Sequence, residues 1–247
     1  MTRLSIFVFG LLFSWQAMAA ELTVSAAASL TNAFRDLAPL FEAKHSDVKV
    51  QLNFAGSGAL MQQIVKGAPV DVFASADQKT MDQAQEQGFV NVDQRRDFVS
   101  NSLVVIVPTD SKAVPASLDD IVKPQYQRIA IGLPASVPVG RYTKTVLEEA
   151  NLWAAVEPKM IGAQNVRQAL DYVARGEVDG GFVYGTDAAL MPEKVKVAFS
   201  VPTETPILYP IAPITKSDKQ ELAQSFVDFV ATPEAQAVLA KYGFGKP

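Results

Sequence analysis

Residues 22–32 read LTVSAAASLTN, and residues 48–60 read VKVQLNFAGSGAL. Each stretch starts as an apolar, strand-like run and changes to a helical pattern at a serine, Ser29 in the first and Ser57 in the second. No charged residue lies within five positions of either serine. A serine at a helix start sits beside unpaired backbone N–H groups, where the helix dipole adds partial positive charge. The pattern predicts a neutral site for an oxyanion, although an N-cap role stays open for each serine alone.

Apolar runs alternate with amphipathic helical patterns along most of the chain, which indicates an α/β fold. One predicted helix is capped by Asn165 at its start and ends at Gly176. The predicted strands are residues 22–27, 48–54, 71–75, 102–107, 128–131, 181–184 and 195–199.

Two places in the chain favour crossings between two lobes. The apolar run at residues 102–107 follows a polar stretch, and the chain becomes extended again near Tyr209. This division assigns residues 20–101 plus 211–247 to one lobe and residues 102–210 to the other. Two extended strands that join two lobes form a hinge, because a few residues at element ends can absorb the rotation of closure.

The first 19 residues have the pattern of a secretory signal peptide: Arg3, an apolar run from Leu4 to Trp15, and small residues up to Ala19. We expect cleavage after about Ala19 and a periplasmic protein without direct membrane insertion, because no later segment approaches about 20 apolar residues. Arg3 is the only charged residue among the first 19, so 21 basic and 26 acidic residues remain. No basic patch indicates a nucleic-acid partner.

The composition also limits the chemistry. The chain has no cysteine and one histidine, His45, which excludes thiol catalysis and metal sites built from thiolates or several histidines. A serine-dependent hydrolase at Ser29 or Ser57 is an alternative from another functional class. Neither serine lies in a Gly-x-Ser-x-Gly motif, and His45 lies at the far end of the helix that Ser29 precedes.

The second half of the chain holds features that match the two serines. Helices are predicted to start near Val139 and Val166, and each start offers free N–H groups. Tyr184 ends an apolar strand, and its phenol is a donor that carries no positive charge. Arg141 and Arg167 lie next to these helix starts, and we expect both to face solvent.

Six segments, taken in order, resemble the periplasmic molybdate-binding proteins of ABC transporters over essentially the whole mature chain. They are AAASLTN at residues 26–32, GAPVDVFASAD at 67–77, NSLV at 101–104, VRQAL at 166–170, VYGTDA at 183–188 and KYGF at 241–244. The resemblance implies a two-lobed type II periplasmic-binding-protein fold with two hinge crossings. It also implies a monomeric receptor, not an enzyme, that needs no cofactor and delivers molybdate or tungstate to a membrane permease.

The resemblance assigns the ligand contacts to five residues, which touch the oxygens of the anion and not its metal. Ser29 and Ser57 supply hydroxyl and main-chain donors, Val139 and Val166 supply main-chain N–H groups, and Tyr184 supplies its phenol. A receptor for another oxyanion, such as sulfate or phosphate, remains the main alternative.

The chain departs from a common pattern of this family at three positions. Gly56 and Gly58 flank Ser57 where serines are frequent, and Val139 stands where alanine is common. A backbone donor survives a change of side chain, so the valine has little effect on the expected contact, while the glycines alter the rigidity of the loop.

Overall fold

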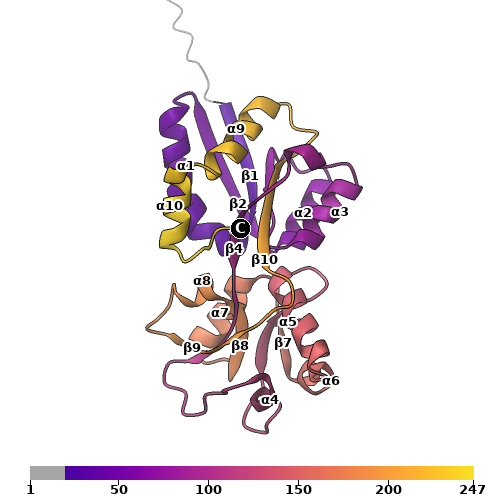
Figure 1. Cartoon of the computed structure of the whole chain (residues 1–247), viewed down its shortest axis with the longest axis vertical. Coiled ribbons are helices and arrows are strands. Elements are labelled where there is room, and N and C mark those ends of the chain that lie inside the picture. The colour runs from indigo at the N-terminus through magenta and orange to yellow at the C-terminus, as the bar shows by residue number, and fades with distance from the viewer. Residues whose placement is uncertain (1–19) are drawn as a thin grey trace, which may run out of the picture.

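The structure is a computed structural model that describes residues 20–247. The predicted signal peptide lies outside the described residues. Figure 1 shows two lobes stacked along the long axis, each built around one sheet. Within the described part of the chain, no helix is long and apolar enough to cross a membrane.

The first sheet has five strands in the order β2-β1-β3-β10-β4. Strands β1 to β3 are parallel, and β10 runs antiparallel to both β3 and β4. Ala27 pairs with Ala55, so β1 and β2 end side by side and the residues that follow them are neighbours. The strands are β1 (Ala20–Ala27), β2 (Val48–Ala55), β3 (Val72–Ala74), β4 (Arg96–Asn101) and β10 (Ile207–Pro213).

The second sheet repeats this arrangement in the order β7-β6-β8-β5-β9. Strands β6, β7 and β8 are parallel, and β5 runs antiparallel to β8 and β9. Gly132 pairs with Ala163, so β6 and β7 also end together. The strands are β5 (Leu103–Pro108), β6 (Ile129–Gly132), β7 (Met160–Ala163), β8 (Gly180–Tyr184) and β9 (Val195–Val201).

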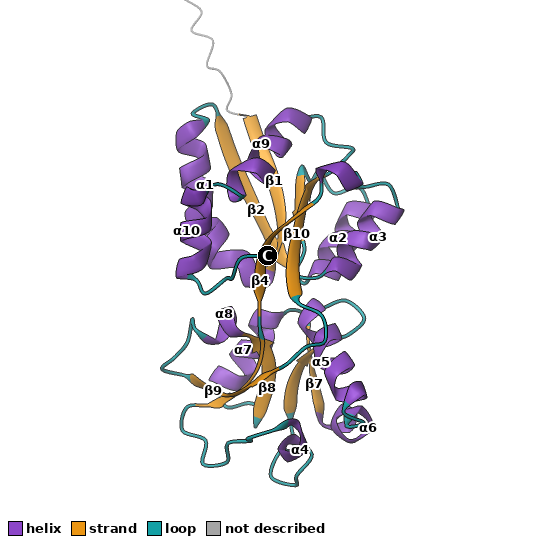
Figure 2. Cartoon of the chain, viewed as in Figure 1, coloured by secondary structure: helices purple, strands orange, loops and turns teal. Residues whose placement is uncertain are grey.

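Helices cover both faces of the first sheet (Figure 2). Val72 and Ala74 of β3 pack with α1, α9 and α10, while Phe73 points to the opposite face and packs with α2 and α3. This alternation follows from the two-residue period of a strand. The helices are α1 (Thr31–Lys44), α2 (Ser57–Val65), α3 (Gln78–Glu86), α9 (Gln220–Val230) and α10 (Pro233–Lys241).

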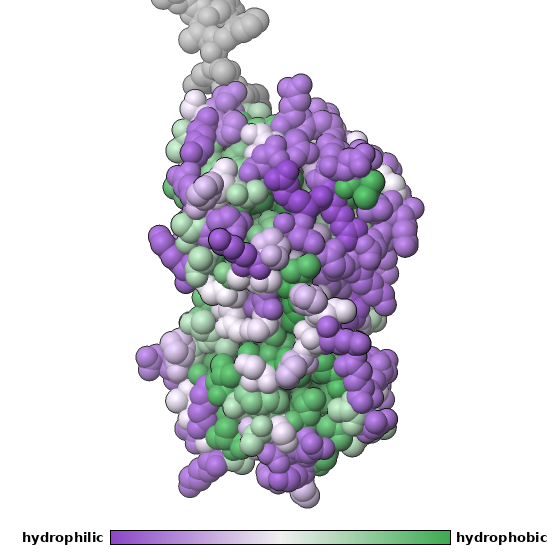
Figure 3. Space-filling view, viewed as in Figure 1, coloured by the Kyte–Doolittle hydropathy of each residue, from purple (hydrophilic) through white to green (hydrophobic). Residues whose placement is uncertain are grey.

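The second lobe is covered mainly by α5 and α7, which contact β6 and β8. The start of α5 approaches the end of β6 so closely that a Cβ on Gly140 would lie 1.8 Å from the carbonyl oxygen of Gly132. In the view of Figure 3 the upper lobe is mostly hydrophilic, and hydrophobic residues gather over the strands of the lower lobe. The helices are α4 (Leu118–Ile121), α5 (Pro138–Glu149), α6 (Trp153–Val156), α7 (Val166–Ala174) and α8 (Gly185–Ala188), and the 3-10 turns are η1 (Ala28–Leu30), η2 (Val92–Gln94) and η3 (Glu157–Lys159).

The chain passes between the sheets twice, at Ser102 and at residues 202–206. The boundary expected at residue 211 falls inside β10, whose pairing with β4 starts at Ile207. The second crossing therefore lies a few residues earlier than the sequence suggests. Pro210 lacks the N–H of an ordinary strand residue, and it sits where the register of β10 against β4 shifts.

Candidate functional site

A small cavity of about 10 Å³ lies between the lobes, at the carboxyl ends of the parallel strands. Ligands of open α/β sheets bind at such strand ends. The cavity is far smaller than the roughly 300–1,000 Å³ of pockets that hold drug-sized ligands. All five residues proposed from the sequence line it: Ser29, Ser57, Val139, Val166 and Tyr184.

The residues that line the cavity are uncharged, but the helix ends around it favour a negative charge. None of the described residues that line it carries a charge. Helix α2 begins at Ser57, α5 begins at Pro138 and α7 begins at Val166, so three helices from both lobes start at its wall. Their N-terminal dipoles and unpaired N–H groups favour a negative charge in the centre.

Ser29 is not a helix N-cap. It lies within the 3-10 turn η1, which follows β1, and its hydroxyl makes no capping bond. Its Oγ instead lies 2.9 Å from the phenol oxygen of Tyr209 on β10. The side chain is held from the first sheet while it lines the cavity.

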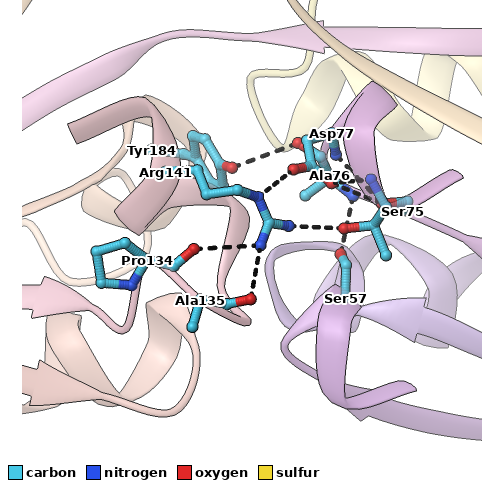
Figure 4. A network of polar contacts seen from close by, with 9 residues as sticks. Ser57, Ser75, Ala76, Asp77, Pro134, Ala135, Arg141 and Tyr184 are labelled. Atoms are coloured by element: carbon cyan, nitrogen blue, oxygen red, sulfur yellow. Dashed lines mark hydrogen bonds and ion pairs between the residues drawn. The ribbon is translucent and has the colours of Figure 1, made fainter. Parts of the chain in front are cut away.

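Ser57 is the first residue of α2, and Gly56 occupies the N-cap position. The Ser57 hydroxyl accepts a hydrogen bond of 3.0 Å from the N–H of Ala76, which follows β3 (Figure 4). The N-cap interpretation of both serines is therefore wrong. Their hydroxyls are engaged instead by Tyr209 of β10 and by Ala76 after β3, because these strands lie side by side with β1 and β2 in the sheet.

Val139 and Val166 offer backbone donors. They are the second residue of α5 and the first of α7, so neither has a partner one turn back within its helix. Within the described residues, no other backbone or side-chain acceptor takes either N–H group. Both side chains are buried, so the cavity meets these residues through the main chain and its apolar surroundings.

Tyr184 ends β8 and is 1% exposed. Its phenol donates a long hydrogen bond of 3.4 Å to the carbonyl oxygen of Ala76 in the other lobe (Figure 4). Burial raises the pKa of Tyr184 well above its ordinary value, and nearby Tyr209 adds to the effect. The phenol therefore stays protonated and remains a donor.

The lobes touch through main-chain atoms at the glycines. The N–H of Gly58 donates to the carbonyl oxygen of Ser136 at 2.9 Å. A Cβ on Gly58 would lie 2.6 Å from this oxygen, and a Cβ on Gly56 would lie 2.7 Å from the carbonyl oxygen of Gln164. Both distances are too short for a side chain. The glycines that depart from the family pattern thus lie where the main chains of the two lobes approach each other closely.

Arg141 joins the lobes beside the cavity (Figure 4). Its Nε donates to Asp77 at 2.7 Å, and its Nη2 donates to the hydroxyl of Thr80 at 2.6 Å. Asp77 also caps α3 by accepting from the N–H of Thr80. The expectation that Arg141 faces solvent is wrong, because the carboxylate and the hydroxyl of the first lobe draw it across the gap.

Arg167 forms a second bridge. It pairs with Asp187 inside the second lobe. Its other nitrogens donate to the side chain of Asn32 at 2.8 Å and to the carbonyl oxygen of Ser29 at 3.0 Å, both in the first lobe. The solvent-facing position expected for Arg167 is wrong as well. Both guanidinium groups donate to acceptors of the protein itself, and these contacts hold the lobes together around the cavity.

A wider groove of about 820 Å³ lies beside Arg141, between α3, α5 and residues 205–208. Its wall contains both signs of charge, and two of its ion pairs, Arg141 with Asp77 and Lys144 with Glu148, are already formed. The small cavity is the better site, because it alone combines helix N-termini with uncharged donors from both lobes.

The hydrolase alternative finds no support in the geometry. His45 stacks on Phe41, with ring centroids 4.2 Å apart, and its Nε2 lies 3.3 Å from the hydroxyl of Ser225. It does not line the cavity that holds Ser29 and Ser57. A serine nucleophile activated by histidine requires the two side chains to be in contact.

Reasoning from the sequence did not identify the contacts of Tyr209 and Asn101 or the arginine bridges, all of which lie around the site. Asn101 ends β4, and its Nδ2 donates to the Tyr209 phenol at 3.1 Å. Each of these contacts joins residues more than 60 positions apart. A charged residue just inside a helix start, as at Arg141 and Arg167, is the one hint that the sequence offers.

Asp187 makes folding stability depend on pH. Burial raises its pKa to about 6, and the adjacent Arg167 opposes this shift. Its Oδ2 accepts no hydrogen bond within the described residues. A carboxyl whose folded pKa lies above its unfolded value stabilises the protein when protonated, and this contribution is lost as the pH rises towards the folded pKa.

We predict that Asp187→Asn removes this dependence. The free energy of unfolding of the wild type, relative to the variant, should fall by up to about 3 kcal/mol between pH about 4 and about 6 and then level off. Denaturant titrations at a series of pH values measure this difference. A difference that stays constant across the range would contradict the assignment.

Residues 22–245 match the family model of bacterial extracellular solute-binding proteins. The molybdate-binding protein ModA of Escherichia coli (strain K12) is 37% identical over 231 residues, which cover 91% of this chain and 88% of that protein. ModA of Haemophilus influenzae is 33% identical over 254 residues, which cover 99% of this chain and 98% of that protein.

Two solved structures of other binding proteins have a similar fold. The periplasmic molybdate-binding protein of Azotobacter vinelandii has a TM-score of 0.79 at 26% identity, covering 92% of this chain and 99% of that one. The sulfate-binding protein SubI of Mycobacterium tuberculosis has a TM-score of 0.79 at 19% identity, covering 91% of this chain and 86% of that one, and shows the fold alone. The predicted two-lobed type II fold is confirmed. The chain belongs to the bacterial extracellular solute-binding proteins and, within them, to the family of the molybdate-binding protein ModA.

Proposed function

We propose that this protein captures molybdate in the cavity between its lobes and delivers it to the membrane permease of an ABC transporter. The observation that carries the proposal is a cavity without charged lining residues, at which donors from both lobes converge. The oxygens of the anion accept from the hydroxyls of Ser29 and Ser57 and from the N–H groups of Val139 and Val166. They also accept from the phenol of Tyr184, whose proton turns from its long bond with Ala76 towards the anion. No bond is made or broken in this function.

Burying a dianion costs free energy, which the protein must offset without a counter-charge in contact. Hydrogen bonds to a charged group contribute about 1.5 to 3 kcal/mol each. Several converging donors, aided by the N-terminal dipoles of α2, α5 and α7, offset the desolvation of a small anion. The donors belong to two lobes, so the anion favours the closed arrangement.

A site made of donors selects against protonated anions. Hydrogen phosphate carries an O–H that needs an acceptor, and leaving that group unpaired separates near-isosteres strongly. Sulfate is a dianion of the same shape but is smaller, and charge-assisted hydrogen bonds tolerate a narrow range of distances. Tungstate matches molybdate in size and charge, so we propose it as a second ligand.

The same proposal places the protein in the periplasm, after removal of a signal peptide that ends near Ala19, and as a monomer. The transporter then distinguishes the closed, loaded form from the open one. The donors of Tyr184, Val139 and Val166 on one lobe and of Ser29 and Ser57 on the other make closure the consequence of binding.

The first test is a calorimetric titration of the mature protein with four anions. Molybdate and tungstate should bind tightly and raise the melting temperature, because a ligand that binds the folded state stabilises it. Sulfate and phosphate should bind at least about a hundredfold more weakly. Equal responses to all four anions would contradict the selectivity argument.

The second test replaces the serines. Ser29→Ala and Ser57→Ala should each weaken molybdate binding about tenfold to a hundredfold, because each removes one hydrogen bond to a charged ligand. Ser225→Ala is the matched control, since Ser225 lies beside His45 and does not line the cavity. Unchanged affinity in both site variants would remove the serines from the site.

The third test distinguishes two possible effects of Asp77 on molybdate affinity: its bridge stabilises the closed state, and its negative charge repels the anion. Asp77→Asn keeps a good N-cap for α3 but breaks the ion pair with Arg141. Loss of the bridge makes the closed state less stable, so we expect molybdate affinity to fall about threefold to tenfold. Affinity is measured by calorimetry at fixed ionic strength.

The opposite result is as informative. If long-range charge decided affinity, removing the negative charge of Asp77 would tighten anion binding, which would contradict the role of the bridge. Asp82→Asn is the control, because Asp82 lies on the same helix and pairs with Arg95 within the first lobe. It removes the same charge and leaves the interlobe contacts intact.

A further inference from the structure

Tyr209 is buried beside the cavity but is absent from the set of ligand-binding residues. It lies on β10 and is 0% exposed. Its phenol oxygen lies 2.9 Å from the Oγ of Ser29 and accepts a hydrogen bond of 3.1 Å from the Nδ2 of Asn101. Distance alone leaves open which of the two hydroxyls, Tyr209 or Ser29, donates to the other.

The direction of these hydrogen bonds follows from a contact of Asn101 at the first crossing between the lobes. The backbone N–H of Ser102, the residue at the first crossing, donates to the Oδ1 of Asn101 at 2.9 Å. An N–H can only donate, so the atom of Asn101 that faces it is the carbonyl oxygen. The other end of the amide is therefore the NH₂ group, which donates to Tyr209 and also to the hydroxyl of Thr186.

The phenol of Tyr209 then has a single acceptor for its proton among the described residues. A buried phenol donates its proton to an acceptor, and the amide nitrogen of Asn101 cannot accept. Among the described residues, the remaining partner of the phenol is the Oγ of Ser29. Ser29 thus accepts from Tyr209, and its own proton is left to point at the cavity that it lines.

Ser57 is set in the same way by a different group. Its Oγ accepts from the N–H of Ala76 at 3.0 Å, so its proton is also left for the cavity. A serine hydroxyl normally acts as donor or acceptor, as its surroundings require. Here a fixed donor fills one acceptor position of each hydroxyl, and within the described residues the hydroxyl proton has no protein acceptor, so it is available to a ligand in the cavity.

We propose that Tyr209, oriented by Asn101, is a specificity-determining positioning residue that turns the hydroxyl of Ser29 into an obligate donor. This inference rests on the proposed function. It explains why a hydroxyl, which could in principle accept from hydrogen phosphate, does not rescue the binding of a protonated oxyanion. Burial raises the pKa of Tyr209 well above its ordinary value, so the phenol keeps the proton on which the arrangement depends.

The test is a double-mutant cycle on molybdate affinity. Tyr209→Phe keeps the ring and removes the proton, and we expect molybdate to bind about tenfold more weakly. In the Ser29→Ala background the same change should alter affinity less than about twofold, because Tyr209 acts through Ser29. In the Ser57→Ala background the tenfold loss should persist.

The second readout is selectivity. In Tyr209→Phe the Ser29 hydroxyl is free to accept, so the preference for molybdate over phosphate near neutral pH should fall about tenfold or more. Asn101→Ala, which releases Tyr209 to turn its proton, should show a smaller loss in the same direction. Tyr242→Phe is the control, because the Tyr242 phenol bonds to Asp36 on the surface, away from the cavity.

Each outcome has a distinct meaning. Equal losses for Tyr209→Phe in the wild-type and Ser29→Ala backgrounds, or an unchanged preference for molybdate, would overturn the role of Tyr209 and leave the proposed function in place. A wild-type protein that binds no oxyanion would overturn the proposed function and this inference with it. Melting curves without ligand show whether each variant is folded. If Tyr209→Phe is unfolded, Asn101→Ala takes its place in the double-mutant cycle with Ser29→Ala.

Discussion

The two lobes meet through main-chain atoms, and the rest of the site depends on how close this contact brings them. The N–H of Gly58 reaches the carbonyl oxygen of Ser136 at 2.9 Å. In this arrangement a Cβ on Gly58 or Gly56 would lie within 2.7 Å of a carbonyl oxygen of the other lobe, so a side chain at either position requires the lobes to shift. With glycine at both positions, the starts of α2, α5 and α7 come together at one cavity.

Positive charge surrounds this cavity without entering it. Arg141 and Arg167 each cross from the second lobe to acceptors of the first, so their charge stabilises the closed arrangement. A guanidinium in contact with the ligand would attract any small anion, whereas neutral donors in fixed directions distinguish anions by protonation and size. The arginines therefore hold the lobes together, and the neutral donors recognise the anion between them.

The sequence predicted the α/β class and seven of the strands, because their apolar runs are long or are followed by a helix start. It missed β4 and β7, and it marked β10 only as an extended segment. The sequence of β4 is RDFVSN, which has polar residues at both ends, and β7 has four residues. Short or partly polar strands gain their stability from pairing with neighbours, which a local pattern does not reveal.

The sequence predicted residues that line the cavity, but it did not predict their hydrogen bonds. Strand–helix junctions indicated Ser29 and Ser57. Predicted helix starts and a strand end indicated Val139, Val166 and Tyr184, and the resemblance to a family assigned ligand contacts to all five. The partners of the serines were out of reach, since Tyr209 lies 180 positions from Ser29. The capping role that local reasoning favours was wrong because β3 and β10 lie beside β1 and β2, and donors on or after these strands engage the hydroxyls.

The glycine contact also bears on size. A two-lobed receptor can grip a smaller ligand by closing further, unless something stops it. Here the carbonyl oxygen of Ser136 already lies at hydrogen-bond distance from Gly58, and further closure would force main-chain atoms into overlap. On the proposed function, the lobes cannot follow a smaller tetrahedral dianion inward. Sulfate would leave the donors of one lobe out of reach, so the selection against it comes from the rigid stop between the lobes as well as from the donors themselves.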